Sequence, residues 1–223
     1  GNNLFIKRLL YDTEVQLTTD GSETTHNGVL SVQAAKAFGQ THQMEWSKDS
    51  KALVYAKDNK LYMYHVHYKW NKQIELPEGD NVHITRIKWS YKDNLFAVMY
   101  LDEVQKKLSV AMVNAETLIA KRVYTYTDNR FISPDIASTI LFFPENDNFA
   151  ILSDKDGYIH AYVYTQAGIL KHQIGKGNFD VTKIYGYDAK NKLVYYQSTE
   201  NGPLNRGVYA IGLYDGKKRA LAT

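Results

Sequence analysis

Residues 44–50 read Met-Glu-Trp-Ser-Lys-Asp-Ser, and residues 87–93 read Ile-Lys-Trp-Ser-Tyr-Lys-Asp. Each motif is followed by two apolar stretches rich in β-branched and aromatic side chains, with a polar turn between them. Such side chains favour strands, and a strand pattern that recurs every 40 to 50 residues or so is typical of β-propeller blades. The two motifs therefore predict a propeller.

A looser third copy of the repeat begins near residue 141, and a fourth copy begins near residue 184. The aromatic anchors of the four copies are 43, 54 and 44 positions apart, and they are Trp46, Trp89, Phe143 and Tyr187. Because Trp46 and Trp89 occupy equivalent positions in their repeats, we expect both in the core between neighbouring blades.

Ahead of the first full copy, residues 4–10 and 14–18 read as the two outer strands of a blade whose inner strands are missing. We therefore expect an all-β protein, a β-propeller with about four to five four-stranded blades that is partial or atypically closed. A single domain is expected over residues 1–223, with blade repeats at roughly 1–20 (partial), 40–78, 82–127, 138–175 and 180–223.

Two kinds of segment interrupt the strand pattern. The run Gln33-Ala34-Ala35-Lys36-Ala37 has strong helical propensity and no alternation, so it predicts one short helix near residues 30–38. Longer polar insertions are expected to be loops at the propeller faces, where ligand contacts concentrate, and they span residues 102–107, 128–138 and 199–206.

The composition excludes several classes of function. The 18 tyrosines and 44% hydrophobic content suit a packed all-β core. The net charge of +3 is spread along the chain without a Lys/Arg cluster, so neither nucleic acid nor an anionic membrane is an expected partner. The absence of cysteine excludes disulfides, thiolate metal sites and a cysteine nucleophile. No run of about 18 apolar residues occurs, so membrane insertion by this segment is not expected.

Three stretches carry a family resemblance. Residues 153–162 read Ser-Asp-Lys-Asp-Gly-Tyr-Ile-His-Ala-Tyr, residues 177–182 read Gly-Asn-Phe-Asp-Val-Thr, and residues 194–200 read Val-Tyr-Tyr-Gln-Ser-Thr-Glu. The last is followed by Pro203-Leu204-Asn205-Arg206. Together these strings resemble the N-terminal β-propeller of the dipeptidyl peptidase IV family, in the prolyl oligopeptidase superfamily of serine peptidases. The resemblance is to a diverged form and spans nearly the whole chain.

The resemblance implies a substrate clamp that this chain lacks. In the family, a short helix ahead of a Trp-Ser strand carries glutamates that hold the free amino terminus of a peptide. Counting back without gaps from Trp46 places those positions on Ala35, Lys36 and Ala37. No carboxylate is present there, and the Lys36 ammonium would repel an amine. We therefore expect the clamp to be lost.

The family's hydrolase domain is also missing, because no Gly-x-Ser-x-Gly nucleophile elbow occurs in the sequence. No catalytic residue and no cofactor are expected in this chain. The leading hypothesis is a non-catalytic module that binds a peptide or protein. The alternative is the N-terminal domain of a longer, active serine exopeptidase that removes dipeptides. A structural assembly subunit is a third possibility, because open strand edges would permit a homo-oligomer.

The chain starts at Gly1 without a methionine or an apolar export segment, and its last residues read as a strand that stops at Thr223. We therefore expect a fragment of a longer protein. The resemblance implies export to the periplasm or cell surface, with any signal segment lost upstream.

Histidines provide two candidate sites. The spacing of His65 and His67 is compatible with zinc, with His83 as a third ligand, but no acidic cluster is patterned around them, and we expect no metal. Within the family-like hairpin, the set Asp156, Gly157, Tyr158 and His160 is expected to be structural, with the glycine supplying a positive φ and the histidine ring packing between blades.

Four further residues are candidate surface contacts. Trp70 lies in the polar stretch 68–72, where it would either stack on a ligand or pack under a loop. Arg130, Glu200 and Arg206 lie in the long insertions and are possible contacts at a propeller face. For Glu200 and Arg206 the alternative is an ion pair within their loop.

Overall fold

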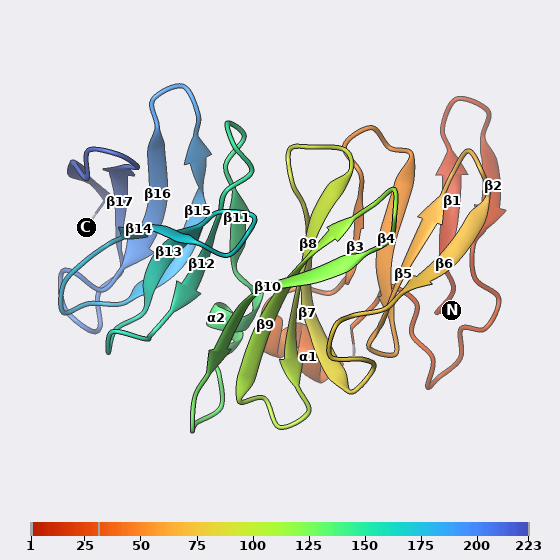
Figure 1. Cartoon of the computed structure of the whole chain (residues 1–223), viewed down its shortest axis with the longest axis horizontal. Coiled ribbons are helices and arrows are strands. Elements are labelled where there is room, and N and C mark those ends of the chain that lie inside the picture. The colour runs from red at the N-terminus through yellow and green to blue at the C-terminus, as the bar shows by residue number, and fades with distance from the viewer. Residues whose placement is uncertain (1, 31, 223) are drawn as a thin grey trace. The chain divides into compact units, whose positions relative to one another are not determined.

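A computed structural model describes residues 2–30 and 32–222. The expectations placed on Gly1, on Thr223 and on position 31 of the helical segment lie outside the described residues. The chain divides into two compact units, residues 1–131 and 132–223, and each is described by itself. Figure 1 shows the helices and strands of both.

Unit 1 holds one helix and three antiparallel sheets (Figure 1). The helix is α1 (Val32–Phe38). A two-stranded sheet is formed by β1 (Phe5–Arg8) and β2 (Thr13–Gln16). The first four-stranded sheet contains β3 (Met44–Trp46), β4 (Ala52–Lys57), β5 (Lys60–His65) and β6 (Trp70–Ile74). The second contains β7 (Val82–Trp89), β8 (Leu95–Asp102), β9 (Lys107–Asn114) and β10 (Ala120–Thr127).

Unit 2 holds one helix and two four-stranded antiparallel sheets. The helix is α2 (Pro134–Ser138). One sheet contains β11 (Ile140–Phe142), β12 (Phe149–Ser153), β13 (His160–Tyr164) and β14 (Leu170–Ile174). The other contains β15 (Val181–Asp188), β16 (Leu193–Ser198), β17 (Gly207–Gly212) and β18 (Lys218–Ala222).

Every four-stranded sheet is a meander in which strands that follow one another in the sequence pair side by side. Tight turns set the register. Lys57 pairs with Lys60 across a two-residue turn in which Asp58 and Asn59 have φ values of 48° and 62°. Asp and Asn tolerate this left-handed region better than other side chains, which suits the tight hairpin that connects β4 and β5.

The core of unit 1 lies between its two four-stranded sheets. Val54 and Met63 from the first sheet pack in one cluster with Trp89, Phe96 and Val98 from the second, and all five are at most 3% exposed. Both faces of β8 and β9 are buried. A sheet that is covered on both faces explains the continuous apolar runs that follow the motif at residues 87–93.

The all-β propeller pattern is confirmed: the described residues form four four-stranded sheets and one two-stranded sheet. The expectation of a single domain stays a prediction. No helix in the described part of the chain is both long and apolar enough to cross a membrane.

One expectation about the core is wrong. Trp89 is buried at 3% exposure, but Trp46 is 40% exposed. Trp46 pairs with Leu53, so both lie on the sheet face that carries Tyr55. That face packs against Leu4 and Leu17 beside the two-stranded sheet, which is too small to cover a tryptophan.

The sequence also predicted only one helix, whereas residues 134–138 form a second within a segment expected to be a loop. Ser133 caps α2, accepting a hydrogen bond from the backbone of Ile136, and Pro134 occupies the first turn. Ser followed by Pro is a helix start signal that identifies this turn in retrospect.

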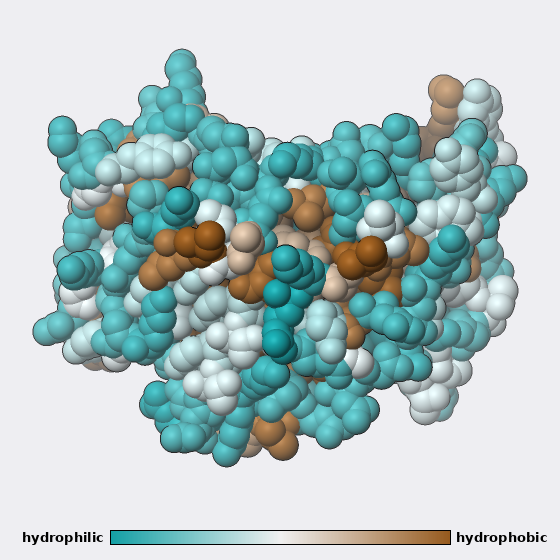
Figure 2. Space-filling model, viewed as in Figure 1, coloured by the Kyte–Doolittle hydropathy of each residue, from teal (hydrophilic) through white to brown (hydrophobic). Residues whose placement is uncertain are grey.

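The hairpin of β1 and β2 is largely exposed. Its turn carries Leu9, Leu10 and Tyr11, which are 86%, 84% and 72% exposed. Figure 2 shows a hydrophobic tip at the upper right, where Figure 1 places this hairpin. Among the described residues, no other strand pairs with either strand, so association through open edges stays a prediction.

Candidate functional site

The predicted clamp positions lie on α1. The helix contains no aspartate or glutamate. Ala35 is half-buried, and Lys36 and Ala37 are exposed. Residues 35–37 therefore present a single charge to solvent, and that charge is positive.

The segment after α1 is fixed to β7 by two glutamines. The Gln40 amide donates to the carbonyl of Thr85 over 2.5 Å and its oxygen accepts from Arg86 over 2.6 Å. The buried Gln43 amide donates to the carbonyl of Ile84. These bonds hold the C-terminal end of α1 at the edge of the second sheet, so the helix has a defined position.

A small pocket of about 230 Å³ lies against α1, which contributes Ala34. Its polar groups include His26, His83 and Asp58. The backbone amide of His26 donates to Asp58 over 3.4 Å. One carboxylate and two imidazoles do not reproduce a paired-carboxylate clamp.

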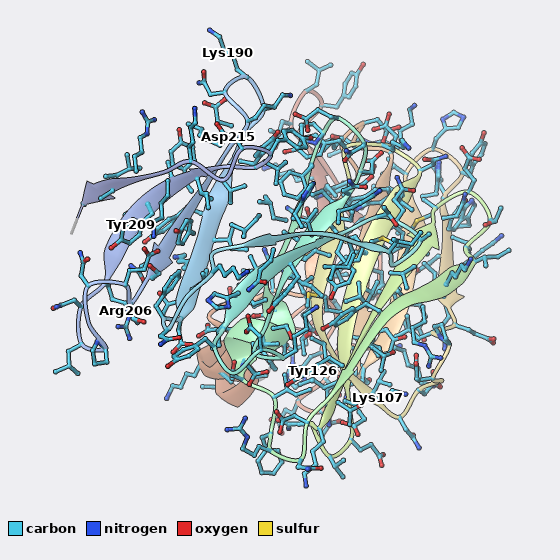
Figure 3. All side chains as sticks on the ribbon, turned by 60° about the vertical axis from the view of Figure 1, so that its left-hand side comes forward. Lys107, Tyr126, Lys190, Arg206, Tyr209 and Asp215 are labelled. Carbon is cyan, nitrogen blue, oxygen red and sulfur yellow. The ribbon has the colours of Figure 1, made fainter. Side chains whose placement is uncertain are left out.

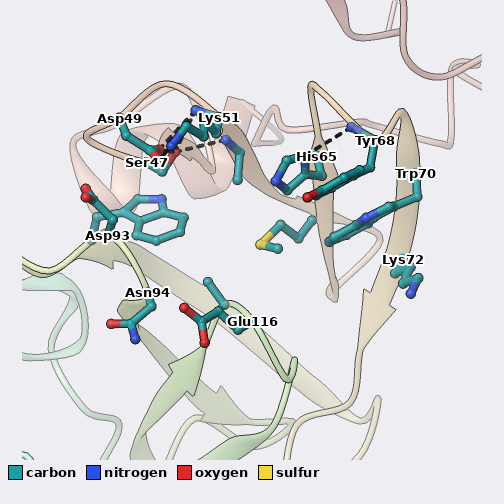
Figure 4. Close-up of a pocket in the computed structure, with 14 residues that line it drawn as sticks. Ser47, Asp49, Lys51, His65, Tyr68, Trp70, Lys72, Asp93, Asn94 and Glu116 are labelled. Atoms are coloured by element: carbon teal, nitrogen blue, oxygen red, sulfur yellow. Dashed lines mark hydrogen bonds and ion pairs between the residues drawn. The ribbon is translucent and has the colours of Figure 1, made fainter.

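A larger pocket of about 560 Å³ opens between the two four-stranded sheets of unit 1. Figure 4 shows that Tyr68 and Trp70 lie on one side of it and that Asp93, Asn94 and Glu116 lie on the opposite side. Asp93 and Asn94 come from the turn between β7 and β8, and Glu116 comes from the turn between β9 and β10.

The aromatic side of this pocket is built by the connection between β5 and β6. The His65 ring lies 4.6 Å from Tyr68 and 5.4 Å from Trp70, measured between centroids. Trp70 is the first residue of β6 and is half-buried, so it packs under the connection while its ring still lines the pocket. His67 contacts Tyr68 at 5.0 Å. In the part of the chain that the structure describes, no group of three or more metal-ligating side chains is found.

One carboxylate of this pocket is already engaged. Asp49 accepts from the Ser47 hydroxyl over 2.7 Å and pairs with the Lys51 ammonium over 3.0 Å. The Ser47 hydrogen bond is the main reason that the pKa of Asp49 falls to about 2. Asp49 therefore stays charged and keeps the turn between β3 and β4 closed.

The family-like hairpin in unit 2 pairs a buried histidine, His160, with an exposed aspartate, Asp156. His160 is 1% exposed, and its Nδ1 lies 3.0 Å from the Asp156 carboxylate. Gln173 donates to the same carboxylate over 2.8 Å. Partial burial would raise the pKa of Asp156, but the bonds from His160 and Gln173 leave it lowered. Gly157, with φ of 98°, provides the turn, and Tyr158 is exposed.

The Nε2 atom of His160 is buried without a hydrogen-bond partner, and the Phe179 ring packs edge-on against the imidazole at 5.2 Å. Because neither Phe179 nor any other described group offers this nitrogen a polar contact, the pair suits packing better than proton transfer.

We expect Asp156→Ala to lower the free energy of unfolding of unit 2 by about 1 to 2 kcal/mol, since a buried imidazole loses its charged partner. The cost stays modest because Gln173 lies 3.2 Å from Nδ1 and can donate to the other tautomer. Urea denaturation measures the change, and Asp156→Asn, which keeps an acceptor, should cost less. Equal losses for both variants would contradict this role of the hydrogen bond.

The remaining candidates are described within the unit that holds each of them. Arg130, in unit 1, is exposed and donates to Asp128 over 3.4 Å. In unit 2, Arg206 lies on the loop before β17 and its guanidinium donates to the carbonyls of Pro203 and Asn205, each over 3.0 Å (Figure 3).

Glu200 has a different partner from the one that its loop suggested. It pairs with the Lys218 ammonium and accepts from the Tyr196 and Ser198 hydroxyls over 2.9 Å and 3.1 Å. The side-chain bonds of Arg206 go to its own loop, so the alternative of an ion pair between Glu200 and Arg206 is not realised.

Sequence reasoning missed the acidic side of the larger pocket. Asp93 lies in the turn that follows the second Trp-Ser pair, and Asp49 lies in the turn that follows the first. Equivalent turns of consecutive blades lie at the same end of their sheets, and this is the signal that brings the two turns together. Glu116 had no such signal, because only the pairing of β9 with β10 places its turn there.

Comparison with known proteins gives consistent matches. The family model described as the dipeptidyl peptidase IV N-terminal region matches residues 1–60 and 58–223. Probable dipeptidyl peptidase 4 of Aspergillus clavatus is 22% identical over 94% of this chain and 33% of the relative. Dipeptidyl peptidase 4 of Trichophyton tonsurans is 24% identical over 96% of this chain and 33% of the relative. The chain thus spans about a third of the length of these curated relatives.

Two solved structures agree in fold. The crystal structure of Porphyromonas gingivalis dipeptidyl peptidase 4 is 32% identical with a TM-score of 0.89, and the match covers 99% of this chain and 36% of that one. A putative dipeptidyl aminopeptidase IV from Bacteroides ovatus is 18% identical with a TM-score of 0.77, covering 97% and 39%. The second match supports the fold alone.

Proposed function

The chain belongs to the family of dipeptidyl peptidase IV N-terminal regions, and we propose that it is a non-catalytic propeller module that binds peptides or proteins without the family's amine clamp. The observation that carries this proposal is the Ala-Lys-Ala sequence at residues 35–37 of α1, whose only charge is the exposed ammonium of Lys36. Export, which the resemblance implies, is part of the same proposal.

Electrostatics supports the loss of amine recognition. A peptide ammonium is held when carboxylates surround it with charge-assisted hydrogen bonds. Here it would face the like charge of Lys36, and the small pocket beside α1 offers only the Asp58 carboxylate. The bonds of Gln40 to Thr85 and Arg86 fix the C-terminal end of α1. A small shift of the helix would therefore not place another carboxylate next to a peptide ammonium.

The alternative function is that of the substrate-binding domain of an active serine exopeptidase. The observation behind it is that the relatives are dipeptidyl peptidases about three times as long as this chain. In that case the hydrolase domain lies outside these 223 residues, and other groups select the substrate. Sequencing the gene past residue 223 for a Gly-x-Ser-x-Gly elbow, and assaying its full product on a dipeptide arylamide, distinguishes the two functions.

The test of the lost clamp is to restore the acids. We expect the chain to bind a free-amino dipeptide weakly and the variant Lys36→Glu with Ala37→Glu to bind it roughly tenfold more tightly, as expected from one or two new charge-assisted bonds. Isothermal titration measures both, with the N-acetylated dipeptide as the control ligand. Unchanged affinity in the variant, or tight binding by the unaltered chain, would contradict the proposal.

A further inference from the structure

We propose that the 560 Å³ pocket between the two four-stranded sheets of unit 1 binds the arginine side chain of a peptide or protein partner. This site is separate from α1 and does not rest on the proposed function. Ala52, at the start of β4, lines it, whereas Asp58, just after the end of β4, lines the small pocket beside α1. At about 3.3 Å per residue, the two sites lie at opposite ends of the strand, roughly 20 Å apart.

The floor of the pocket is buried and apolar. Ala52, Met63 and Trp89 line it and are 5%, 1% and 3% exposed. A volume of about 560 Å³ falls within the usual range of ligand clefts. The pocket is therefore large enough for one long side chain and its flanking backbone, with a base that is already packed.

One wall of the pocket carries two carboxylates that form no direct ion pair. The carboxylates of Asp93 and Glu116 have no hydrogen-bond or ion-pair partner among the described residues, and both side chains border the pocket (Figure 4). The nearby Lys51 ammonium forms its ion pair with Asp49 over 3.0 Å and is attracted to Asp93 through space without a direct contact. Carboxylates only accept hydrogen bonds, so a ligand facing this wall has to donate them.

The opposite wall is aromatic. Tyr68, from the connection between β5 and β6, and Trp70, at the start of β6, project toward the acidic side (Figure 4). The Trp70 ring already attracts a cation, because the Lys72 ammonium lies 5.0 Å from its centroid. A cation placed between these walls gains both the ring quadrupole and the carboxylate charge.

An arginine meets both walls at once. Its guanidinium is planar, stacks on aromatic rings and presents five donors in a fork that matches carboxylates. Its alkyl stem would lie over Met63 and Ala52 at the floor. The Lys72 ammonium at the rim opposes an incoming cation, so its removal is expected to tighten binding.

The ligand for the test is acetyl-Gly-Arg-Gly-amide, titrated into the intact chain in 20 mM salt, with the citrulline peptide as its neutral isostere. Both peptides are blocked at both ends, so α1 and any amine recognition do not contribute. We expect the arginine peptide to bind at least about tenfold more tightly than the citrulline peptide, and its affinity to fall as salt screens the charges.

Variants locate the site. Asp93→Asn combined with Glu116→Gln is expected to weaken binding by about tenfold, and Trp70→Leu by about fivefold. Lys72→Met is expected to tighten it about twofold to fivefold. The matched control is Glu103→Gln, an exposed carboxylate of the same unit that does not line the pocket and should leave affinity unchanged.

A second readout is the indole resonance of Trp70, assigned among the three tryptophans by its loss in Trp70→Leu. It should shift on titration while that of Trp46 stays in place. Equal affinity for the arginine and citrulline peptides, a weaker Lys72→Met complex, or no shift of Trp70 at millimolar peptide would overturn the proposal. An oligosaccharide that binds through Trp70 while the arginine peptide does not would assign the pocket to carbohydrate instead.

Discussion

Replacing Trp89 by alanine is expected to lower the free energy of unfolding of unit 1 by about 3–5 kcal/mol, the usual cost of truncating a fully buried tryptophan. Trp89 is 3% exposed, its ring packs 4.9 Å from that of Phe96, and its indole N–H donates to the carbonyl of Glu45 over 3.1 Å. The substitution removes packing between two sheets and one hydrogen bond that joins them. Denaturant unfolding followed by far-UV circular dichroism measures the loss.

The control for Trp89 is provided by the repeat itself. Trp46 occupies the equivalent motif position but is 40% exposed, so Trp46→Ala should cost only about 1 kcal/mol. A similar loss for both variants would mean that Trp46 is covered in solution, for example by a second chain on the β1–β2 side. Measuring the unfolding midpoint at two protein concentrations detects such a partner, because the midpoint then depends on concentration.

The same two tryptophans show how far the sequence predicts this fold. The spacing of the motifs predicts strands, blades and turns, because each of these depends on local residues. Burial of Trp89 depends on the neighbouring sheet, to which Glu45 belongs, and burial of Trp46 would need a complete sheet before β3. A sequence pattern predicts the strand in which it occurs, but it does not predict which other sheet packs over that strand.

The candidate site also has one part that the sequence predicts and one part that it does not. The resemblance places residues 35–37 on a helix ahead of the first motif, and the structure has α1 there. Asp93 and Glu116 belong to turns of different hairpins, and only the stacking of two sheets brings them opposite Trp70. Hydrophobic periodicity carries no information about this pairing, because the residues involved are polar and lie outside the strands.

Glu78→Gln is expected to lower the free energy of unfolding of unit 1 by about 2–3 kcal/mol at pH 7, less than for a fully buried ion pair because Glu78 remains partly solvated. The Glu78 carboxylate is 17% exposed and accepts from the Arg122 guanidinium over 2.6 Å and from the Tyr100 hydroxyl. Lys107 lies 3.8 Å away. Glu78 sits in the connection between β6 and β7, so these bonds tie the connection to the second sheet.

The pH dependence distinguishes this charge network from simple packing. Burial would raise the pKa of Glu78, but the bonds from Tyr100 and Arg122 and the charges of Arg122 and Lys107 leave it below its usual value. A carboxyl group whose pKa is lower in the folded state stabilises the fold fully at pH values above its unfolded pKa. For a glutamate that unfolded pKa is about 4.3. The contribution disappears as the pH falls through the lower, folded value. The difference between the native chain and Glu78→Gln should therefore be constant from pH 8 to about 6 and shrink below about pH 4.

The control for the network is Glu103→Gln, which changes an exposed carboxylate of the same unit and should stay within about 0.5 kcal/mol of the native chain. Tyr100→Phe completes a double-mutant cycle. Because the Tyr100 hydroxyl is held by Glu78, the two substitutions together should cost less than the sum of their separate effects. Strict additivity, or a Glu78→Gln deficit that persists unchanged at pH 3, would show that the carboxylate charge does not hold the connection between β6 and β7 in place.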